Sequence, residues 1–260
     1  MRLTCAVSAA ALVLALPAAQ GVRANAADVH TVLAAPRERV QTADFRASGH
    51  LVRVDANGTR ISYGLTINAH WFPGVLRMLV DVASPASARE HVLLEMRPTG
   101  ETTIRIAHPG DKKPAVLPFD KWSDGPLSGG FSYEDFLEPQ YFWPGQTVVE
   151  ETKFGARDCD VLKSTPGVAD RKHYAEIRSW LDHGIGFPVY VEKTMKETRA
   201  VKEFTYFGLR HDSGVWSASQ VEVKTRGHAG STLLIIDRGS AKANLGLGDF
   251  SSEQLTRFQD

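Results

Sequence analysis

Apolar and polar residues alternate along residues 60–71, where every second side chain is apolar and the others are polar or small. A period of two puts successive side chains on opposite faces of a β-strand, so this segment predicts a strand with one buried face. The dipeptide Asn57-Gly58, which favours a tight hairpin turn, precedes the segment. We therefore expect residues 45–54 and 60–71 to pair as antiparallel strands.

Shorter apolar runs, separated by turn-forming glycine, proline, asparagine and aspartate, continue along the rest of the chain. About a dozen such runs predict a mainly β protein, in which an antiparallel sheet curves strongly or closes into a barrel. No linker of distinct composition divides the chain, so we expect a single domain. Further strands are expected over residues 75–83, 90–97, 102–107, 147–154, 159–164, 173–181, 187–195, 201–209, 215–225 and 232–238.

The expected domain begins and ends with short helices. Residues 28–35 carry apolar side chains at helical spacing, and Asp28 is available as the N-cap residue. Pro36 has no backbone N–H, so we expect the first helix to end or kink there. Residues 251–254 form a capping box that opens a C-terminal helix.

A proline-rich loop and another short helix interrupt the series of strands. Residues 111–130 hold three prolines and end in glycines, which predicts a long loop. Residues 132–135, Ser-Tyr-Glu-Asp, form a capping box. The capping box opens a short helix that runs through Leu137, and Pro139 is expected to close it.

The first 26 residues have the pattern of a secretory signal peptide. Residues 6–19 contain no charged side chain, and Ala24-Asn25-Ala26 supplies the small residues that signal peptidase recognises. The alternative is a membrane anchor. The uncharged run is short for a membrane span, which needs about 20 residues, and this favours a signal peptide. We expect cleavage after Ala26 and export, so that residues 27–260 form one domain in the periplasm.

Charge, cysteine and histidine content argue against several classes of protein. The chain has 30 Lys and Arg and 30 Asp and Glu residues without a basic run, which argues against nucleic-acid binding. Two cysteines are too few for a disulfide-rich scaffold or a four-cysteine zinc site. The histidines are scattered singly, and His50 and His70 fall on the polar faces of expected strands. We therefore expect no metal and no cofactor.

No common enzyme motif occurs in the sequence, and we do not expect the protein to be an enzyme. The only candidate group surrounds Cys159, which could act as a nucleophile between Asp158 and Asp160, two carboxylates on one face of a strand. We expect instead a buried structural thiol, with the two carboxylates exposed at the end of the strand.

Bulky aromatic residues are concentrated in residues 131–143. Phe131, Tyr133 and Phe136 bracket the short helix, and residues 141–143 are Tyr-Phe-Trp. This composition is unusual, because loops run over the surface and are mostly polar. Two interpretations stay open: the segment plugs the sheet as part of the core, or it forms a lid over an apolar cavity.

Residues 129–136, Gly-Gly-Phe-Ser-Tyr-Glu-Asp-Phe, resemble the G-S-D-F-S-Y-E-D segment of the outer membrane lipoprotein-sorting protein family, the LolA-like proteins. The order of later features is also similar. Residues 174–182 end in an aromatic-x-Asp turn, Phe187-Pro188 opens the next strand, and residues 250–255 resemble the terminal helix of the family. The two glycines stand where Ser-Asp is usual, so no polar role is carried over to them.

The resemblance implies both a fold and a function. The implied fold is a half-open antiparallel β-barrel of about eleven strands, with short helices as plug or lid. The implied function is that of a periplasmic carrier, which shields the acyl chain of a lipid or lipoprotein in an apolar cavity during transport to the outer membrane. Its partners would include an inner-membrane exporter and an outer-membrane acceptor. A periplasmic sensor or interaction module that gates a membrane partner stays open as the alternative, ahead of an enzyme.

The candidate ligand-binding residues lie on the apolar face of the clearest strand and in the aromatic segment. Binding would be driven by desolvation of the acyl chain, at roughly 0.8 kcal/mol per buried methylene. The candidates are Tyr63, Leu65, Ile67, Trp71, Phe131, Tyr133, Phe136, Leu137, Phe142 and Trp143.

Overall fold

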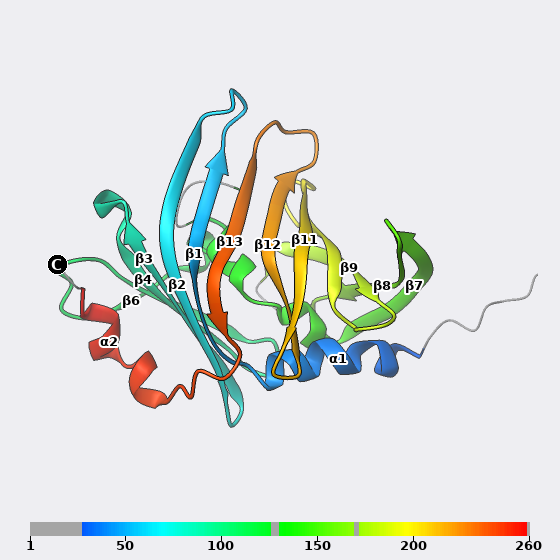
Figure 1. The fold of residues 1–260 in the computed structure, drawn as a ribbon, viewed down its shortest axis with the longest axis horizontal. Coiled ribbons are helices and arrows are strands. Elements are labelled where there is room, and N and C mark those ends of the chain that lie inside the picture. Colours follow the sequence, from blue (N-terminus) through cyan, green and yellow to red (C-terminus); the bar gives the residue numbers. More distant parts are fainter. Residues whose placement is uncertain (1–27, 126–129, 169–171, 259–260) are drawn as a thin grey trace, which may run out of the picture.

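The computed structural model describes residues 28–125, 130–168 and 172–258. The expected signal peptide, residues 1–26, lies outside the described residues. The described residues are mainly β, and their thirteen strands belong to one antiparallel sheet (Figure 1). The strands are β1 (Asp44–Val54), β2 (Arg60–Phe72), β3 (Val75–Ser84), β4 (Glu90–Met96), β5 (Thr102–Ala107), β6 (Ala115–Val116), β7 (Gly145–Phe154), β8 (Arg157–Thr165), β9 (Tyr174–Asp182), β10 (Pro188–Met195), β11 (Val201–Asp212), β12 (Val215–Thr225) and β13 (Ser231–Ser240).

Strands that follow one another in the sequence are neighbours in the sheet, with one exception among the described strands. The order is β6-β5-β4-β3-β2-β1-β13-β12-β11-β10-β9-β8-β7, so β1 and β13 pair and join the two ends of the domain. The edge strands β6 and β7 do not pair with each other, and the curved sheet stays open. The half-open antiparallel architecture is therefore confirmed, with two more strands than the resemblance implied.

The hairpin expected from the alternating pattern is formed by β1 and β2. Leu51 lies opposite Tyr63 in the register of the two strands, and both side chains are buried. Gly58 adopts a φ of 83° in the turn, and its N–H donates to the carbonyl oxygen of Asp55 at 2.9 Å. Glycine reaches this left-handed conformation without strain, which is why the Asn-Gly signal located the turn.

The pairing of β1 with β13 depends on a close approach at Gly49. The register of the two strands shifts between Ser48 and Gly49. A Cβ atom at Gly49 would lie 1.9 Å from the carbonyl oxygen of Ile235, so only glycine fits at this point.

The helices occupy different sides of the sheet. α1 (Val29–Gln41) runs along the lower end of the barrel in Figure 1 and contacts β7 and β8, whereas α2 (Ser252–Thr256) packs on the outside against β4 and β5. No helix among the described residues is long and apolar enough to cross a membrane. The 3₁₀ helices are η1 (Ala86–Ala88), η2 (Phe119–Lys121), η3 (Tyr133–Phe136), η4 (Pro139–Phe142) and η5 (Leu247–Phe250).

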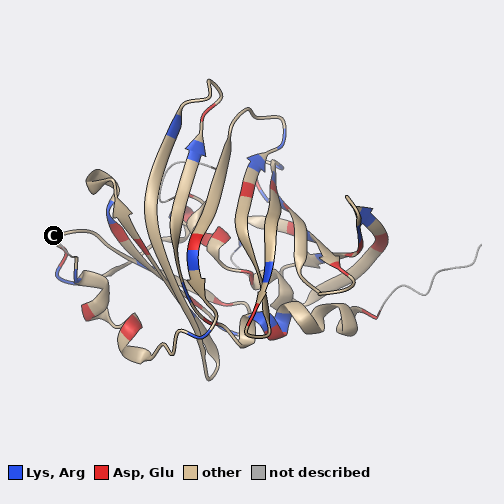
Figure 2. Cartoon of the chain, viewed as in Figure 1, with Lys and Arg blue, Asp and Glu red and all other residues tan. Residues whose placement is uncertain are grey.

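The main core lies on the inner face of the curved sheet. Its buried members include Val80, Leu94 and Ile104 from one half of the sheet and Phe204 and Val223 from the other. A smaller cluster on the outer face of β3 to β5 packs beneath α2. Figure 2 shows basic and acidic residues interspersed over the described strands, which matches the balanced charge of the sequence.

Pro36 does not end the first helix, although an end was one of the two outcomes expected from the sequence. α1 continues through Pro36 to Gln41, because its buried face extends past the proline to Val40. Packing of that face outweighs the backbone hydrogen bond that proline cannot make. Asp28 occupies the N-cap position, but its carboxylate accepts from the hydroxyl of Thr31 and not from a backbone N–H.

The prediction of one long loop over residues 111–130 is also partly wrong, because this segment contains the edge strand β6 and the helix η2. The capping box of Ser132 and Asp135 is confirmed, although it opens a 3₁₀ helix. Pro139 follows this helix but opens the next one, η4, since proline is well tolerated at the first helical position.

Candidate functional site

Residues 130–143, which we call the plug, lie on the inner side of the curved sheet. The N–H of Gly130 donates to the hydroxyl of Thr232 on β13 at 3.2 Å. The N–H of Tyr133 donates to the carbonyl oxygen of Asp124 at 3.0 Å. The plug therefore consists of a loop and two short helices. Hydrogen bonds to β13 and to the loop before the plug hold it inside the sheet.

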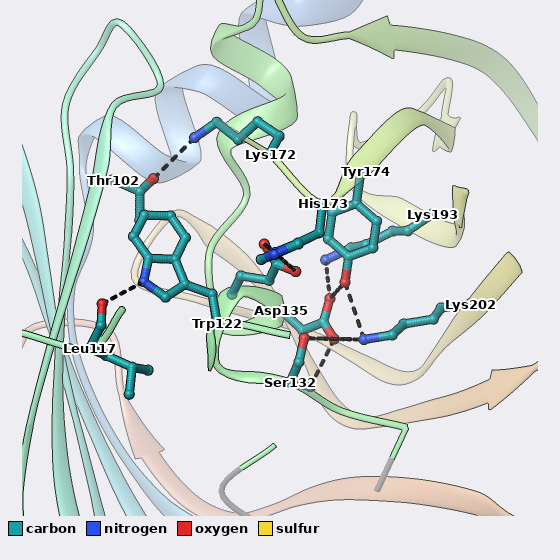
Figure 3. A network of polar contacts seen from close by, with 11 residues as sticks. Thr102, Leu117, Trp122, Ser132, Asp135, Lys172, His173, Tyr174, Lys193 and Lys202 are labelled. Atoms are coloured by element: carbon teal, nitrogen blue, oxygen red, sulfur yellow. Dashed lines mark hydrogen bonds and ion pairs between the residues drawn. The ribbon is translucent and has the colours of Figure 1, made fainter. Parts of the chain in front are cut away.

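The capping box fixes the position of the Asp135 carboxylate. This carboxylate accepts from the backbone N–H of Ser132 at 2.9 Å and from the Ser132 hydroxyl at 2.7 Å. Two hydrogen bonds to the start of the same turn leave the side chain little freedom. The carboxylate then faces the side chains that project inward from β9, β10 and β11 (Figure 3).

Asp135 is the centre of a buried ionic network (Figure 3). Its carboxylate lies 2.9 Å from Lys193 Nζ and 2.8 Å from Lys202 Nζ, and it accepts from the Tyr174 hydroxyl at 2.6 Å. The side chain of Asp135 is 0% exposed, that of Lys193 5% and that of Lys202 11%. Burial raises the pKa of the Asp135 carboxyl, but the two lysines outweigh this effect and hold the pKa well below its usual range. The network is therefore charged, not neutralised.

Glu134, the neighbour of Asp135, supplies a second buried carboxylate. Its Oε1 lies 3.1 Å from Nδ1 of His173, just before β9. The ring of Phe119 stacks on His173 at a centroid distance of 4.0 Å. Two consecutive carboxylates of the plug thus face separate basic side chains of the surrounding structure.

A third contact joins the plug to the opposite part of the sheet. The Tyr133 hydroxyl lies 3.1 and 3.0 Å from the two carboxylate oxygens of Glu90 on β4. Burial raises the pKa of Glu90 to about 7, although the hydrogen bond from Tyr133 lowers it in part. Glu90 therefore changes its charge near neutral pH while in contact with the plug.

The ten candidate ligand-binding residues divide into two groups by exposure. The partly exposed group comprises Trp71, Phe136 and Phe142, and the rings of Trp71 and Phe142 stack at a centroid distance of 6.1 Å. The buried group comprises Tyr63, Leu65, Ile67, Phe131, Tyr133, Leu137 and Trp143. Both groups contribute to one apolar cluster, so the structure brings the candidates together. Ligand binding by these residues stays a prediction.

A small cavity lies between the plug and the sheet. Its volume is about 10 Å³, and its lining includes Leu137, Trp143, Tyr174 and Lys193. Trp143 is one of these lining residues, and among the described residues its buried indole N–H has no hydrogen-bond partner. A cavity of this size has room for about one water molecule. An acyl chain would therefore require displacement of part of the plug.

The inward-facing basic residues were not identified from the sequence. Lys193 follows Val191 at a spacing of two, and Lys202 precedes Phe204 at the same spacing. Each lysine therefore lies on the apolar face of its strand, and this was the available signal. The lysines can be buried there because the fold places Asp135 between the two side chains.

The model of a DUF1329-like family, whose description is "uncharacterized protein", matches residues 74–257. The chain belongs to this family. No curated protein matches the chain in sequence.

Three solved structures are similar to the chain over nearly their whole length. A domain from Vibrio parahaemolyticus, named for outer membrane lipoprotein sorting, has a TM-score of 0.78 at 18% identity, covering 88% of this chain and 100% of that chain. A DUF1329 family protein from Desulfovibrio piger has a TM-score of 0.77 at 16% identity, with 87% and 98% covered. A LolA superfamily protein from Nitrosomonas europaea has a TM-score of 0.65 at 15% identity, with 87% and 99% covered. This DUF1329-like chain therefore has the LolA-like fold that residues 129–136 implied.

The candidate group around Cys159 is arranged as we expected, except at Asp160. The thiol is 0% exposed, and burial raises its pKa, so its nucleophilic thiolate form is disfavoured. Asp158 is exposed and pairs with Lys153, as expected for a charge at the end of a strand. Asp160 is the exception, because its side chain is only 13% exposed and lies 3.2 Å from Nε2 of His183.

The two histidines assigned to polar faces each have a carboxylate partner on a neighbouring strand. His50 lies 2.7 Å from Asp237, and His70 lies 3.0 Å from Asp44. Within the residues that the structure describes, no group of three or more His, Cys, Asp or Glu side chains is placed to hold a metal ion.

Proposed function

We propose that this protein is a periplasmic carrier, which binds the acyl chain of a lipid or lipoprotein in the apolar interior of its curved sheet. The observation that carries the proposal is the nature of the interior. The inner face of the sheet is apolar, and it is covered by an inserted aromatic segment rather than by a second sheet or a long helix. The likeness in fold to a domain named for outer membrane lipoprotein sorting supports the same function.

Burial of an acyl chain would contribute a large favourable free energy. About a dozen methylene groups would contribute roughly 10 kcal/mol, at about 0.8 kcal/mol each. This free energy has to exceed the loss of chain freedom and the cost of displacing plug side chains. The partly exposed rings of Phe136, Phe142 and Trp71 are where entry would begin, because moving them exposes the least buried part of the apolar cluster.

The proposal includes the cellular route of the carrier. The expected signal peptide would deliver the protein to the periplasm, where an inner-membrane exporter would load it and an outer-membrane acceptor would unload it. The apolar interior would shield the acyl chain from water between these two steps.

The experiment that tests the proposal measures binding directly. Protein purified from the periplasm without detergent is extracted with organic solvent, and the extract is analysed by lipid mass spectrometry. In parallel, the parent protein is titrated with the methyl ester of cis-parinaric acid, an uncharged fluorescent acyl probe. Saturable binding with one probe per chain is expected, and a parent protein that binds neither copurified lipid nor probe would overturn the proposal.

A matched pair of variants locates the binding surface. Phe142→Ala removes a partly buried ring of the apolar cluster, whereas Phe207→Ala removes an exposed ring on β11. We expect Phe142→Ala to weaken probe binding and Phe207→Ala to leave it unchanged. Equal affinities for both variants and the parent would place the probe outside the interior.

A further inference from the structure

The charges inside the sheet are divided between the plug and the structure that surrounds it. The plug carries two buried carboxylates, Glu134 and Asp135, whereas a third buried carboxylate, Glu90, belongs to β4. The basic side chains belong to the surrounding elements: Lys193 on β10, Lys202 on β11, and His173 directly before β9. Figure 3 shows these basic groups converging on the plug from one side.

This division makes displacement of the plug difficult without a substitute anion. Both lysines have Asp135 as their carboxylate partner among the described residues, and both are almost completely buried. A buried ionic group that loses its partner strongly destabilises a protein, because its desolvation is no longer compensated. An uncharged acyl chain could fill the volume of the plug, but it could not compensate these lysines.

The surrounding side chains form a complete site for one anion. The Nζ atoms of Lys193 and Lys202 approach opposite oxygens of the Asp135 carboxylate, and the Tyr174 hydroxyl donates to the same group. These donors stay on the sheet when the plug moves. Apolar surface adjoins them, since Lys193 Nζ lies 4.5 Å from the centroid of the Phe204 ring.

We infer that the ligand of this interior is an anionic amphiphile, whose carboxylate or phosphate head group takes the position of the Asp135 carboxylate between Lys193 and Lys202. Asp135 is then an internal substitute for the ligand head group, and it occupies the site while the protein is empty. The inference rests on the proposed carrier function, and it adds the chemical class of the ligand. It also accounts for the two lysines on the apolar face of neighbouring strands.

The test compares two probes that differ only in charge. cis-Parinaric acid and its methyl ester have the same acyl chain, but only the acid is anionic at mildly alkaline pH. We expect the parent protein to bind the acid at least about tenfold more tightly than the ester, a factor that corresponds to roughly 1.4 kcal/mol. Binding of both probes with equal affinity would overturn the head-group inference and leave the carrier function standing. Binding of neither probe would overturn the carrier function itself.

Two variants assign the preference to the ionic network. Asp135→Asn keeps the shape of the side chain and removes its charge, so the acid should bind more tightly than it does to the parent and raise the melting temperature further. The triple variant Asp135→Leu, Lys193→Met, Lys202→Met removes all three charges together, which avoids leaving one unpaired. It should bind the ester with the affinity of the parent and show no preference for the acid.

Controls distinguish a head-group site from a loss of folding and from a site for a free anion. Near-ultraviolet circular dichroism and urea unfolding establish that each variant is folded. If the triple variant does not fold, the decision rests on Asp135→Asn, for which an unchanged affinity for the acid would overturn the inference. Retention of the preference in a folded triple variant would also overturn it. Inorganic phosphate should displace the acid only weakly, and equal competition would identify a site for a free anion and overturn the amphiphile as its ligand.

Discussion

Lys202 Nζ lies 2.8 Å from Oδ2 of Asp135, in a buried contact between β11 and the plug. The two residues are 67 positions apart in the sequence, so the contact exists only in the folded chain. It fixes the plug against the sheet and gives the interior a charged centre within an apolar surface. A carrier that opens by moving its plug would have to break this contact and replace it.

The first prediction concerns the stability provided by Asp135. Asp135→Ala should lower the free energy of unfolding by about 3–5 kcal/mol at neutral pH, because it leaves two buried lysines unpaired. Since the folded-state pKa lies below the ordinary value of 3.8, this contribution is present above that value and is lost as the pH falls towards the folded pKa. Urea unfolding at several pH values measures both effects. A loss no larger than that of the exposed control Asp158→Ala would contradict the prediction.

The second prediction concerns Glu90. Its pKa of about 7 in the folded state exceeds the ordinary value of 4.5, so the folded state holds this proton more tightly. The corresponding stability, roughly 3 kcal/mol, is fully present below 4.5 and is lost as the pH rises through about 7. Glu90→Gln should therefore stabilise the protein above neutral pH and flatten its pH dependence. The control Glu101→Gln alters an exposed carboxylate, and an equal response of both variants would refute the assignment.

The third prediction separates core from lid within the plug. Trp143 is 1% exposed, so Trp143→Ala should lower the free energy of unfolding by about 3–5 kcal/mol. Phe142 is only partly buried, so Phe142→Ala should lower it less and act mainly on probe affinity. Tyr133→Ala and Phe136→Ala are intermediate tests, because they alter the helix that joins both regions. Melting and probe binding are measured on the same samples. Parallel losses of stability without any change in affinity would identify the whole plug as core.

The fourth prediction concerns the thiol of Cys159. The side chain is 0% exposed and burial raises its pKa, so a maleimide reagent should label the native protein slowly and the urea-unfolded protein rapidly. The ratio of the two rates is obtained by mass spectrometry of timed samples. Rapid labelling of the native protein would show that the thiol is accessible and would restore the enzyme alternative.

The sequence determined the positions of the described strands except the short edge strand β6, because the signals of the others are local. The alternation along residues 60–71 located β2, and Asn57-Gly58 located the turn before it. Side-chain alternation has the same period as the pleat of a strand, so no knowledge of distant partners was required. The capping box of Ser132 and Asp135 was visible for the same reason, since its two residues are three positions apart.

Only the tertiary structure decided what these elements meet. The pairing of β1 with β13 brings Gly49 against Ile235, and no local pattern indicates such a contact. The sequence left open whether the aromatic segment is plug or lid; the structure buries Trp143 inside the sheet and leaves Phe142 partly exposed, and the third prediction separates the two roles. Lysines on the apolar faces of β10 and β11 contradict a local rule of burial. Their burial is stable because the fold brings Asp135 between them, and charge compensation depends on distance in space rather than in sequence.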